Sequence, residues 1–367
     1  MTDVVVVGGG VIGLSLAYEL AGQGVAVTVF EQGAFGREAS WAGAGILAPG
    51  NPAQASAPQA KLRAESHRLW PQLSAELFER TGIDNGFRNC GGIEVRTDGA
   101  AEQLQEDIIV WRNEGVEVEE LMPTQLFEVE PALNRSIVAA YRLPELSQVR
   151  NPRHLKALIA GCAARGVKLL PGKPVVGFDV EDGKVLAVRT PDETCRAGQF
   201  CVAGGAWTKQ LMADLGIGVP VEPIRGQIVL LSAQPLPIRH VIEFGSRYLV
   251  PRPDGRILVG STEERVGFEK QNTAGAMAGL IEFATDLVPS LSAAKYERAW
   301  SGLRPGSVDD LPYLGRVPEM KNLFLASGHF RSGLQRSPAT ALLVRQVMLG
   351  QETSISLDAF ACDRHRL

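Results

Sequence analysis

Apolar runs and a helical pattern alternate at the start of the chain. Residues 3–7 (DVVVV) and 25–30 (VAVTVF) are short, mostly apolar runs, typical of buried parallel strands. Between them Ile12, Leu16 and Leu20 recur at helical spacing. Strand, helix and strand in this order predict a βαβ unit, and therefore an α/β fold.

The same two patterns continue along the chain. We predict helices over residues 64–80, 101–113 and 154–165. We predict strands over residues 91–96, 166–170, 175–178 and 185–190, and two more that begin at residues 199 and 322. Residues 49–60 are rich in Pro, Ala and Gln, and we expect an exposed, mobile loop there. Ser337-Pro338 fits a helix start, because proline is favoured in a first turn.

Glycines follow the first predicted strand at a spacing that suits a phosphate. Gly8, Gly10 and Gly13 form G-x-G-x-x-G, and Glu31 ends the second strand. Gly8 permits a tight turn, Gly10 lets the backbone approach a pyrophosphate, and Gly13 allows close packing of helix on strand. The helix N-terminus offers free N–H groups to phosphates, and Glu31 would accept hydrogen bonds from a ribose. The unit predicts a dinucleotide, with NAD and FAD both open.

Between residues 220 and 300 the pattern changes to that of an antiparallel sheet, with strands over 226–232, 248–251 and 256–260. We therefore predict a Rossmann-like α/β domain that carries an inserted antiparallel-sheet domain of α+β type. The first, cofactor-binding domain is assigned residues 1–85, 145–215 and 320–367. The second, substrate-binding domain is assigned residues 86–144 and 216–319.

Composition narrows the class of protein. The 367 residues are 45% hydrophobic and 21% charged, with a net charge of −4, which argues against nucleic acid as a partner. No apolar run approaches the length of a membrane span, and the immediate first strand leaves no room for a signal peptide. The cysteines are odd in number and scattered, which indicates reduced thiols in a cytoplasmic protein rather than disulfides or a metal site. They are Cys90, Cys162, Cys195, Cys201 and Cys362.

Four segments together resemble the D-amino-acid oxidase (DAO) family of flavoproteins, most closely its glycine oxidase (ThiO-like) branch. They are GGGVIG with Glu31, residues 40–45 (SWAGAG), 300–305 (WSGLRP) and 328–334 (GHFRSGL). The resemblance covers essentially the whole chain in the right order. The combination of GLRP with GHFRSGL is more specific than any one motif.

The resemblance implies non-covalent FAD, a hydride taken from an amine carbon, and an imine that hydrolyses. Covalent attachment is disfavoured because Cys362 lies well past the flavin turn. The glycine-rich turn before the last helix would bring main-chain N–H groups to the flavin, where they stabilise negative charge. Expected cofactor-binding residues are Gly8, Gly10, Val11, Ile12, Gly13, Glu31, Ser40, Ala42, Gly43, Val175, Gly204, Trp207, Gly328, His329, Arg331, Ser332, Gly333 and Leu334.

The resemblance also places the substrate. Arg304 would hold its carboxylate with a two-pronged donor array. Tyr248 would bond the same carboxylate, and Arg331 would touch the carboxylate or the flavin. Ile46 and Glu263 are expected in the substrate pocket. An apolar residue is typical at the position of Glu263, so we hypothesise that it favours an amine-bearing or basic substrate. No general base is evident, and direct transfer from a neutral amine needs none.

The leading function is therefore an FAD-dependent oxidase of small amino acids (glycine, sarcosine, D-alanine) that yields imine or 2-oxo acid, ammonia and hydrogen peroxide, with a role in thiamine thiazole synthesis. Expected partners are the amino acid and oxygen, with no nucleic acid, no integral membrane segment and no metal, in a homo-oligomer. Alternatives are a D-amino-acid dehydrogenase that passes electrons to a quinone or other carrier, a tRNA-modifying flavoprotein of the same superfamily, and a non-catalytic flavin-binding protein.

Overall fold

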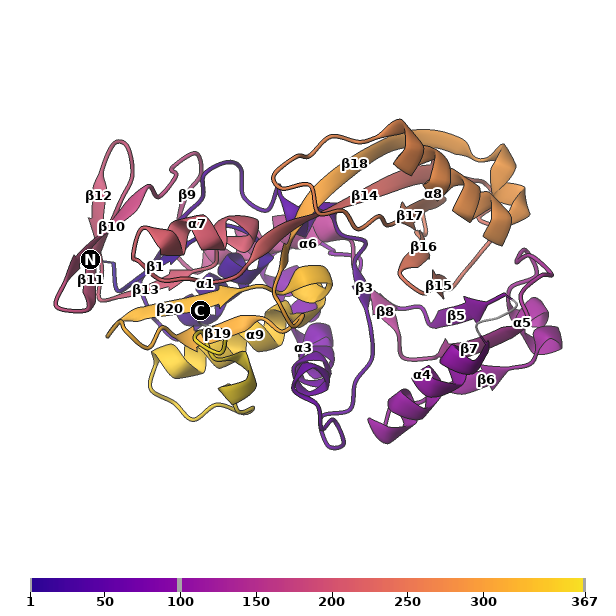
Figure 1. The fold of residues 1–367 in the computed structure, drawn as a ribbon, viewed down its shortest axis with the longest axis horizontal. Helices are drawn as coiled ribbons and strands as arrows, with labels where there is room; N and C mark the ends of the chain where they lie inside the picture. Colours follow the sequence, from indigo (N-terminus) through magenta and orange to yellow (C-terminus); the bar gives the residue numbers. More distant parts are fainter. Residues whose placement is uncertain (1, 98–100, 366–367) are drawn as a thin grey trace.

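The computed structural model describes residues 2–97 and 101–365, which form two lobes (Figure 1). Both ends of the chain lie in the lobe that contains β1 and β20. Its six-stranded sheet has the order β19-β20-β13-β1-β2-β9, and every neighbouring pair is parallel except β19 and β20. The strands are β1 (Val4–Val7), β2 (Val27–Phe30), β9 (Lys168–Leu170), β13 (Gln199–Val202), β19 (Tyr313–Arg316) and β20 (Leu323–Ser327).

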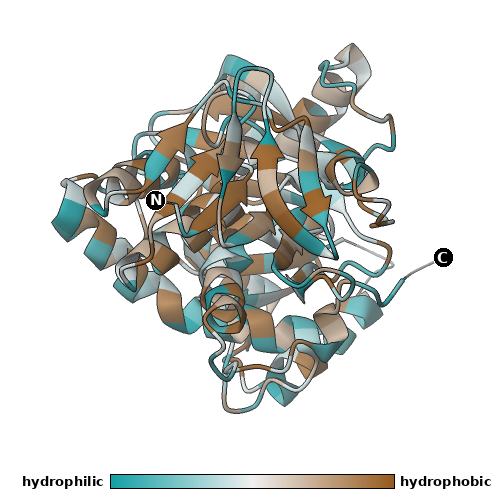
Figure 2. Ribbon diagram, turned by 90° about the vertical axis from the view of Figure 1, so that its left-hand side faces the viewer, coloured by the Kyte–Doolittle hydropathy of each residue, from teal (hydrophilic) through white to brown (hydrophobic). Residues whose placement is uncertain are grey.

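The helices of this lobe pack on one another and on the sheet. They are α1 (Val11–Gly22), α2 (Ala39–Ala42), α3 (Pro58–Thr81), α6 (Asn151–Ala164), α7 (Thr208–Ala213) and α9 (Gly333–Met348). Two small sheets complete it, made of β3 (Ile46–Leu47), β8 (Ser147–Gln148) and β4 (Arg88–Asn89), and of β10 (Gly177–Glu181), β11 (Lys184–Arg189) and β12 (Thr194–Arg196). Apolar strands fill the interior, and polar residues are frequent on the outer helices (Figure 2).

The second lobe is built on an eight-stranded sheet of order β18-β14-β17-β16-β15-β5-β7-β6. Its strands are β5 (Gly92–Arg96), β6 (Glu119–Leu121), β7 (Ala139–Leu143), β14 (Glu222–Ser232), β15 (Val241–Phe244), β16 (Arg247–Pro251), β17 (Arg256–Gly260) and β18 (Lys295–Gly306). Its helices are α4 (Ala101–Asn113), α5 (Pro123–Val129) and α8 (Ala274–Leu287). The sheet is antiparallel except that β15 and β5 run parallel, a pairing that the sequence pattern did not indicate.

The predicted βαβ unit is confirmed, because β1, α1 and β2 follow in order and β1 pairs in parallel with β2. β1 is buried because helices α1, α6 and α9 cover one face of the sheet, and β10, β11 and α7 cover the other. Two strands differ from the predicted domain boundaries. β19 falls within the range assigned to the second domain, yet it pairs with β20 in the six-stranded sheet. β4 also lies within a range assigned to the second domain and yet pairs with β8. The other boundaries stay predictions.

The loop predicted over residues 49–60 is confirmed up to residue 57, but it is shorter than predicted and only partly exposed. α3 begins at Pro58, and Ala55 and Ala60 are buried. A Cβ atom on Gly50 would lie 2.6 Å from the Cα of Ala64, so this segment packs directly on the helix. The small residues of this segment are typical of a loop, but here they allow a close contact with α3. Two other elements shift slightly, since α6 begins at Asn151 and the strand predicted from Val175 begins at Gly177.

The helix start predicted at Ser337-Pro338 is also wrong. α9 begins at Gly333, and Pro338 lies inside it. Proline has no N–H to donate to the carbonyl four residues earlier, which here belongs to Leu334. The Ser337 hydroxyl donates to that Leu334 oxygen at 2.9 Å. The serine therefore supplies the hydrogen bond that the proline cannot make.

His154 of α6 is completely buried beside Trp70, with ring centroids 4.8 Å apart. Its Nδ1 lies 3.3 Å from the side-chain nitrogen of Asn85. Burial lowers the pKa of His154 to about 4, so the imidazole is neutral in the folded protein at neutral pH.

We expect His154→Asn to flatten the pH dependence of stability between about pH 4.5 and 6.5. The unfolded histidine binds a proton below its ordinary pKa of about 6.5, whereas the folded one stays neutral. The free energy of unfolding therefore falls by ~1.4 kcal/mol per pH unit as the pH drops through this window, a slope that asparagine lacks. Urea unfolding of both proteins at several pH values measures the difference. If the free energy of unfolding had the same pH dependence in both proteins, His154 would not be neutral in the folded state.

Candidate active site

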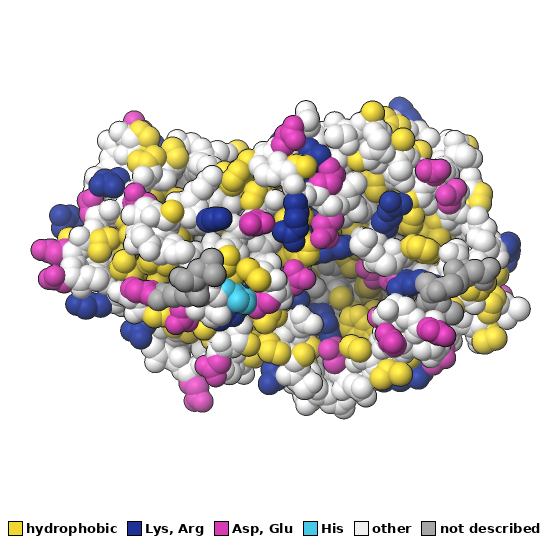
Figure 3. Space-filling view, viewed as in Figure 1, with side chains coloured by type: hydrophobic (Ala, Val, Ile, Leu, Met, Phe, Trp, Pro, Cys, Tyr) yellow, Lys and Arg dark blue, Asp and Glu magenta, His cyan; other side chains and the backbone are white. Residues whose placement is uncertain are grey.

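A cavity of about 580 Å³ lies between the two lobes. In the space-filling view the surface is hollowed between them, with both basic and acidic side chains at the edge (Figure 3). The lining comes from the turn after β1, the segment from Arg37 to Ala48, the turn after β13, the strands β14, β15, β16 and β18, and the turn before α9. Segments that are far apart in the sequence thus share one cavity.

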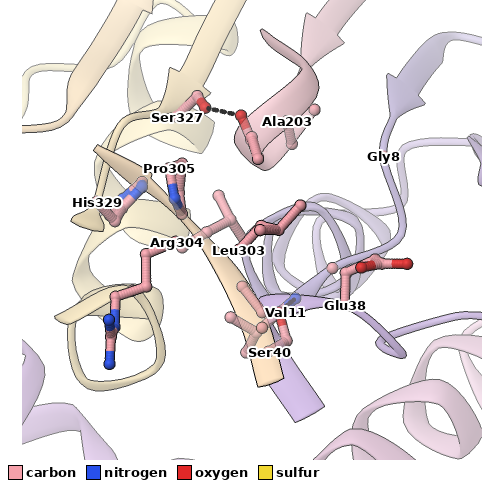
Figure 4. Close-up of a pocket in the computed structure, with 18 of the residues that line it drawn as sticks. Gly8, Val11, Glu38, Ser40, Ala203, Leu303, Arg304, Pro305, Ser327 and His329 are labelled. Atoms are coloured by element: carbon pink, nitrogen blue, oxygen red, sulfur yellow. Dashed lines mark hydrogen bonds between the residues drawn. The ribbon is translucent and has the colours of Figure 1, made fainter. Parts of the chain in front are cut away.

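The turn between β1 and α1 forms one end of this cavity. Gly8 has φ +112°, and a Cβ there would lie 2.3 Å from the Ala203 carbonyl oxygen. α1 starts without a side-chain cap, and the Val11 N–H donates to the Ser40 hydroxyl at 2.9 Å. The remaining N–H groups of the first turn can therefore face an anion. Figure 4 shows Gly8 and Glu38 on one side of the pocket and Arg304 on the other.

Glu31 lies next to this turn, just after β2. Its two carboxylate oxygens accept hydrogen bonds from the Gly9 and Gly33 N–H groups, each at 2.8 Å. These bonds fix the side chain against the glycine turn and leave other lone pairs of both oxygens. The residue can therefore accept further hydrogen bonds from hydroxyl groups of a ligand in the cavity.

A second helix N-terminus reaches the cavity from the C-terminal part of the chain. β20 ends at Ser327, Gly328 adopts φ +82°, and α9 begins at Gly333 without a side-chain cap. His329 lines the cavity between them and is 1% exposed. Its Nε2 lies 2.9 Å from the Thr340 hydroxyl. Burial, reinforced by the positive charge of Arg336, lowers the pKa of His329 to about 3, so the ring is neutral.

Two buried polar atoms that line the cavity lack partners within residues 2–97 and 101–365. They are Oδ1 of Asn151 and Nδ1 of His329. The other amide atom of Asn151, Nδ2, donates to the Ser40 carbonyl at 2.9 Å, which fixes the side chain. Buried polar atoms are nearly always hydrogen-bonded. Together with two uncapped helix starts, these atoms fit a large ligand that carries phosphates, hydroxyl groups and ring nitrogens.

Arg304 on β18 and Tyr248 on β16 line the opposite part of the cavity. The Arg304 guanidinium donates to the Thr262 carbonyl at 3.0 Å and to the Ser261 hydroxyl at 2.7 Å. Burial lowers the pKa of Arg304, and the nearby Tyr248 and Glu263 oppose that shift. Five N–H donors are present on a guanidinium, so Arg304 retains donors for a carboxylate.

Two glycines make room for these side chains. A Cβ on Gly226 would lie 2.3 Å from the Arg304 guanidinium, and one on Gly260 would lie 2.5 Å from the Tyr248 ring. Both glycines are in the middle of the eight-stranded sheet, on β14 and β17. The bare backbone at these positions lets both polar side chains lie flat across the sheet, towards each other.

We expect Gly226→Ala to raise the KM for a substrate that carries a carboxylate about tenfold or more. The new methyl group must displace the guanidinium, and a misplaced buried charge-assisted hydrogen bond costs about 1.5–3 kcal/mol. Steady-state kinetics measure the effect, and Gly275→Ala is the control because a Cβ there meets no atom within 4 Å. Equal KM values for Gly226→Ala and the unsubstituted protein would contradict this account.

Most residues predicted for the site line this cavity. They are Gly8, Gly10, Val11, Ile12, Glu31, Ser40, Ala42, Gly43, Ile46, Val175, Gly204, Trp207, Tyr248, Arg304, His329, Arg331, Ser332, Gly333 and Leu334. Gly13 lies behind the turn, where a Cβ would meet the Gly8 oxygen at 2.0 Å. Gly328 likewise lies behind the cavity, against Tyr313. These two glycines shape the backbone and do not line the cavity.

Glu263 is not among the lining residues, so its predicted place in the pocket needs correction. Its carboxylate lies 3.4 Å from Nη1 of Arg331, and its side chain is 45% exposed. Arg331 also donates to the Ser246 carbonyl at 2.7 Å. Glu263 therefore lies beside Arg331 at the edge of the cavity, close to the turn between β15 and β16.

Other lining residues were not predicted. They include Arg37, Glu38, Asn151, Glu243, Ser261, Gly226 and Gln335. A glycine inside an apolar strand signals a close approach, and this rule points to Gly226 and Gly260. The others carry no local signal in the sequence.

The structure also bears on metals and membranes. Within the described ranges no group of three or more His, Cys, Asp or Glu side chains could hold a metal ion. No described helix is long and apolar enough to cross a membrane. All five cysteines are free thiols.

Comparisons with known proteins agree with this geometry. Residues 3–347 match the DAO family, described as FAD dependent oxidoreductase. The glycine oxidase of Pseudomonas putida is 37% identical over 98% of this chain and 98% of that protein. The bifunctional protein ThiO/ThiG of Trichormus variabilis is 32% identical over 99% of this chain and 55% of that protein. The crystal structure of glycine oxidase from Geobacillus kaustophilus has a TM-score of 0.94 and 35% identity, covering 99% of this chain and 98% of that one.

Proposed function

This chain belongs to the DAO family of FAD-dependent oxidoreductases, and we propose that it oxidises small amino acids, with glycine, sarcosine and D-alanine as substrates and oxygen as the acceptor. It is an FAD-dependent amino-acid oxidoreductase with an α/β fold. The observation that carries the proposal is that one cavity contains both the dinucleotide-type turn around Gly8 and the donor pair of Arg304 and Tyr248.

The residues around the cavity suit FAD. The start of α1 would hold the pyrophosphate, and Glu31 would accept hydrogen bonds from the ribose. The start of α9 would face the flavin with free N–H groups, where a helix N-terminus favours negative charge. Asn151 Oδ1 and His329 Nδ1 would gain the partners that they lack. When bound, FAD would supply two-electron oxidation, in which the amine-bearing carbon loses a hydride and its nitrogen a proton to give an imine, and oxygen takes up the two electrons with two protons as hydrogen peroxide.

The protein itself would bind and orient the substrate. The guanidinium of Arg304 forms a fork that matches a carboxylate, and the Tyr248 hydroxyl adds a third donor. These hydrogen bonds would hold the amine-bearing carbon toward the flavin side of the cavity. The protein would thus contribute to catalysis by orienting the reacting atoms. Arg331 would close the cavity edge while it remains bound to Glu263 and Ser246.

The proposal also covers the use of the product. The similarity to ThiO/ThiG supports a role in which this enzyme provides the imine of glycine for thiamine thiazole synthesis. A cytoplasmic location and a homo-oligomeric state stay predictions.

The test begins with the visible spectrum of the purified protein, in which bound FAD absorbs. Anaerobic addition of glycine, sarcosine or D-alanine should bleach that absorbance, and in air each should yield hydrogen peroxide in proportion to ammonia or methylamine. A protein that cannot take up FAD, or whose flavin no amino acid bleaches, would overturn the proposal. Bleaching without peroxide in air, with activity restored by a quinone, would instead support a D-amino-acid dehydrogenase.

A further inference from the structure

Glu243 is an acidic side chain in the cavity for which the reaction described above has no use. It lies on β15, is partly buried and lines the cavity. Within the described residues its carboxylate has neither a hydrogen bond nor an ion pair. Its oxygens are not among the fully buried polar atoms that lack partners, so the unpaired carboxylate is open to the cavity. Such a group is therefore suited to a partner that arrives with a ligand.

The acid beside Glu243 is satisfied, in contrast. Glu94 on β5 pairs with Glu243 in register and forms an ion pair with Arg96. It also accepts the Gly245 N–H at 2.7 Å. Burial raises the pKa of Glu243 to about 8; the charge of Glu94 adds to this shift, while Arg331 and Arg96 oppose it. Of the two acids, Glu243 alone lacks a hydrogen-bond partner among the described residues.

The strand register places Glu243 on the same face of the sheet as Arg304. Across neighbouring strands, Glu243 on β15 is paired with Tyr248 on β16. Tyr248 is paired with Gly260 on β17, and Gly260 with Ile228 on β14. Gly226, two residues before Ile228, lies under the Arg304 guanidinium. Strands are ~4.8 Å apart, so the three steps from β14 to β15 span about 14 Å. β16, which carries Tyr248, lies between them, so Arg304 and Glu243 line opposite ends of this part of the cavity.

The charges at the Glu243 end do not cancel. Arg331 is the nearest basic side chain that lines the cavity, and it is already bound to Glu263 and to the Ser246 carbonyl. Arg96 is bound to Glu94. Once Glu243 is ionised, these pairs leave its negative charge as the excess.

We propose that Glu243 binds a cationic group at the far end of the substrate, so that the enzyme selects amino acids with an ammonium or guanidinium side chain over neutral ones of the same length. The inference rests on the proposed function, in which Arg304 holds the α-carboxylate. It adds basic amino acids to the substrate range and moves the recognition of positive charge from Glu263 to Glu243.

The test compares substrates of equal length in the FAD-loaded enzyme. D-lysine is measured against D-norleucine, and D-ornithine against D-norvaline, by kcat/KM for peroxide formation. At pH 9, where Glu243 is ionised, each cationic member should be favoured by about tenfold or more in the unsubstituted protein. Glu243→Gln should lower that ratio about 10- to 100-fold, the range expected for a charge-assisted hydrogen bond. Glu222→Gln, which removes an exposed ion pair with Arg265, is the matched control, and its ratio should change by less than about threefold. Glu263→Gln tests the alternative position for recognition of positive charge.

The pH dependence gives a second readout without a variant. Because the pKa of Glu243 is about 8, its carboxylate is neutral below that pH and charged above it. A lysine side chain stays protonated to about pH 10. The D-lysine to D-norleucine ratio should therefore rise between about pH 6 and 9, and it should stay flat in Glu243→Gln. Titratable and charged groups around Glu243 are Glu94 and Arg96 on β5, Tyr141 on β7, Tyr248 on β16 and Arg331 before α9.

Three outcomes would overturn the proposal. A ratio near one in the unsubstituted protein, equal losses for cationic and neutral substrates in Glu243→Gln, or a ratio that falls in Glu263→Gln alone would each do so. Flavin absorbance and the melting temperature show whether Glu243→Gln is folded. If glycine bleaches the flavin and these ratios fail, this inference fails alone. If no amino acid bleaches it, the proposed function fails as well.

Discussion

Arg304→Leu should lower kcat/KM for glycine about 30- to 4,000-fold. Removal of one partner from a buried, hydrogen-bonded charge pair costs about 2–5 kcal/mol, and each 1.4 kcal/mol is a factor of ten. The loss should come mainly from KM, because the guanidinium holds the carboxylate and takes no part in bond breaking. FAD should remain bound, since Arg304 forms its hydrogen bonds with Thr262 and Ser261. Steady-state kinetics and the flavin spectrum measure both parts.

Two controls separate the guanidinium from general damage to the sheet. Arg304→Lys keeps the charge but loses the fork, so its activity should fall between those of the leucine variant and the unsubstituted protein. Arg256→Leu removes an arginine from β17 that forms surface ion pairs with Glu297 and Asp254, and its kcat/KM should change little. If Arg304→Leu slowed an amine without a carboxylate as strongly as it slowed glycine, Arg304 would not be the carboxylate-binding residue.

Features that depend on neighbouring residues could be predicted from the sequence. The glycine spacing after β1 constrains one short turn, so Gly8, Gly10 and Glu31 could be placed without knowledge of the rest of the fold. The turn before α9 is equally local. Both turns line the cavity, with Gly13 and Gly328 behind it as support for the backbone.

Features that depend on pairing between distant strands could not be predicted in this way. Glu243 faces the cavity only because β15 pairs with β16 in a register that sets it opposite Tyr248. A shift of one residue would turn it to the other face of the sheet. Glu263 shows the converse case, because it lies at the edge of the cavity beside Arg331 on a distant turn and not among the lining residues.

Local composition also misled where packing decided the structure. The segment from residue 49 to 60 has the composition of a loop, yet it packs against α3 through Gly50 and buried alanines. Pro338 would normally limit a helix, but a neighbouring hydroxyl compensates for its missing donor. In both places the decisive contact joins atoms whose proximity the residue types alone do not reveal.

Gly8→Ala should reduce bound FAD to less than about a tenth of the normal content and destabilise the first lobe. The new Cβ would lie 2.3 Å from the Ala203 oxygen and 2.7 Å from its carbonyl carbon, and these are main-chain atoms that cannot rotate away. To relieve this contact, β1 and β13 must separate at the edge where the pyrophosphate would bind. A side chain in a left-handed backbone conformation costs ~1–2 kcal/mol, and the close contact adds to this cost. We therefore expect the free energy of unfolding to fall by about 3 kcal/mol or more.

Gly24→Ala is the matched control for this prediction. Gly24 also has a positive φ, +81°, but a Cβ there meets no atom within 4 Å. It should therefore show the backbone strain alone, ~1–2 kcal/mol, with normal FAD content. The affinity of each apoprotein for FAD is measured by titration, with the quenching of flavin fluorescence as the signal. Urea unfolding measures the free energy of unfolding separately. If Gly8→Ala bound FAD as tightly as Gly24→Ala, close approach at this turn would not be what holds the pyrophosphate.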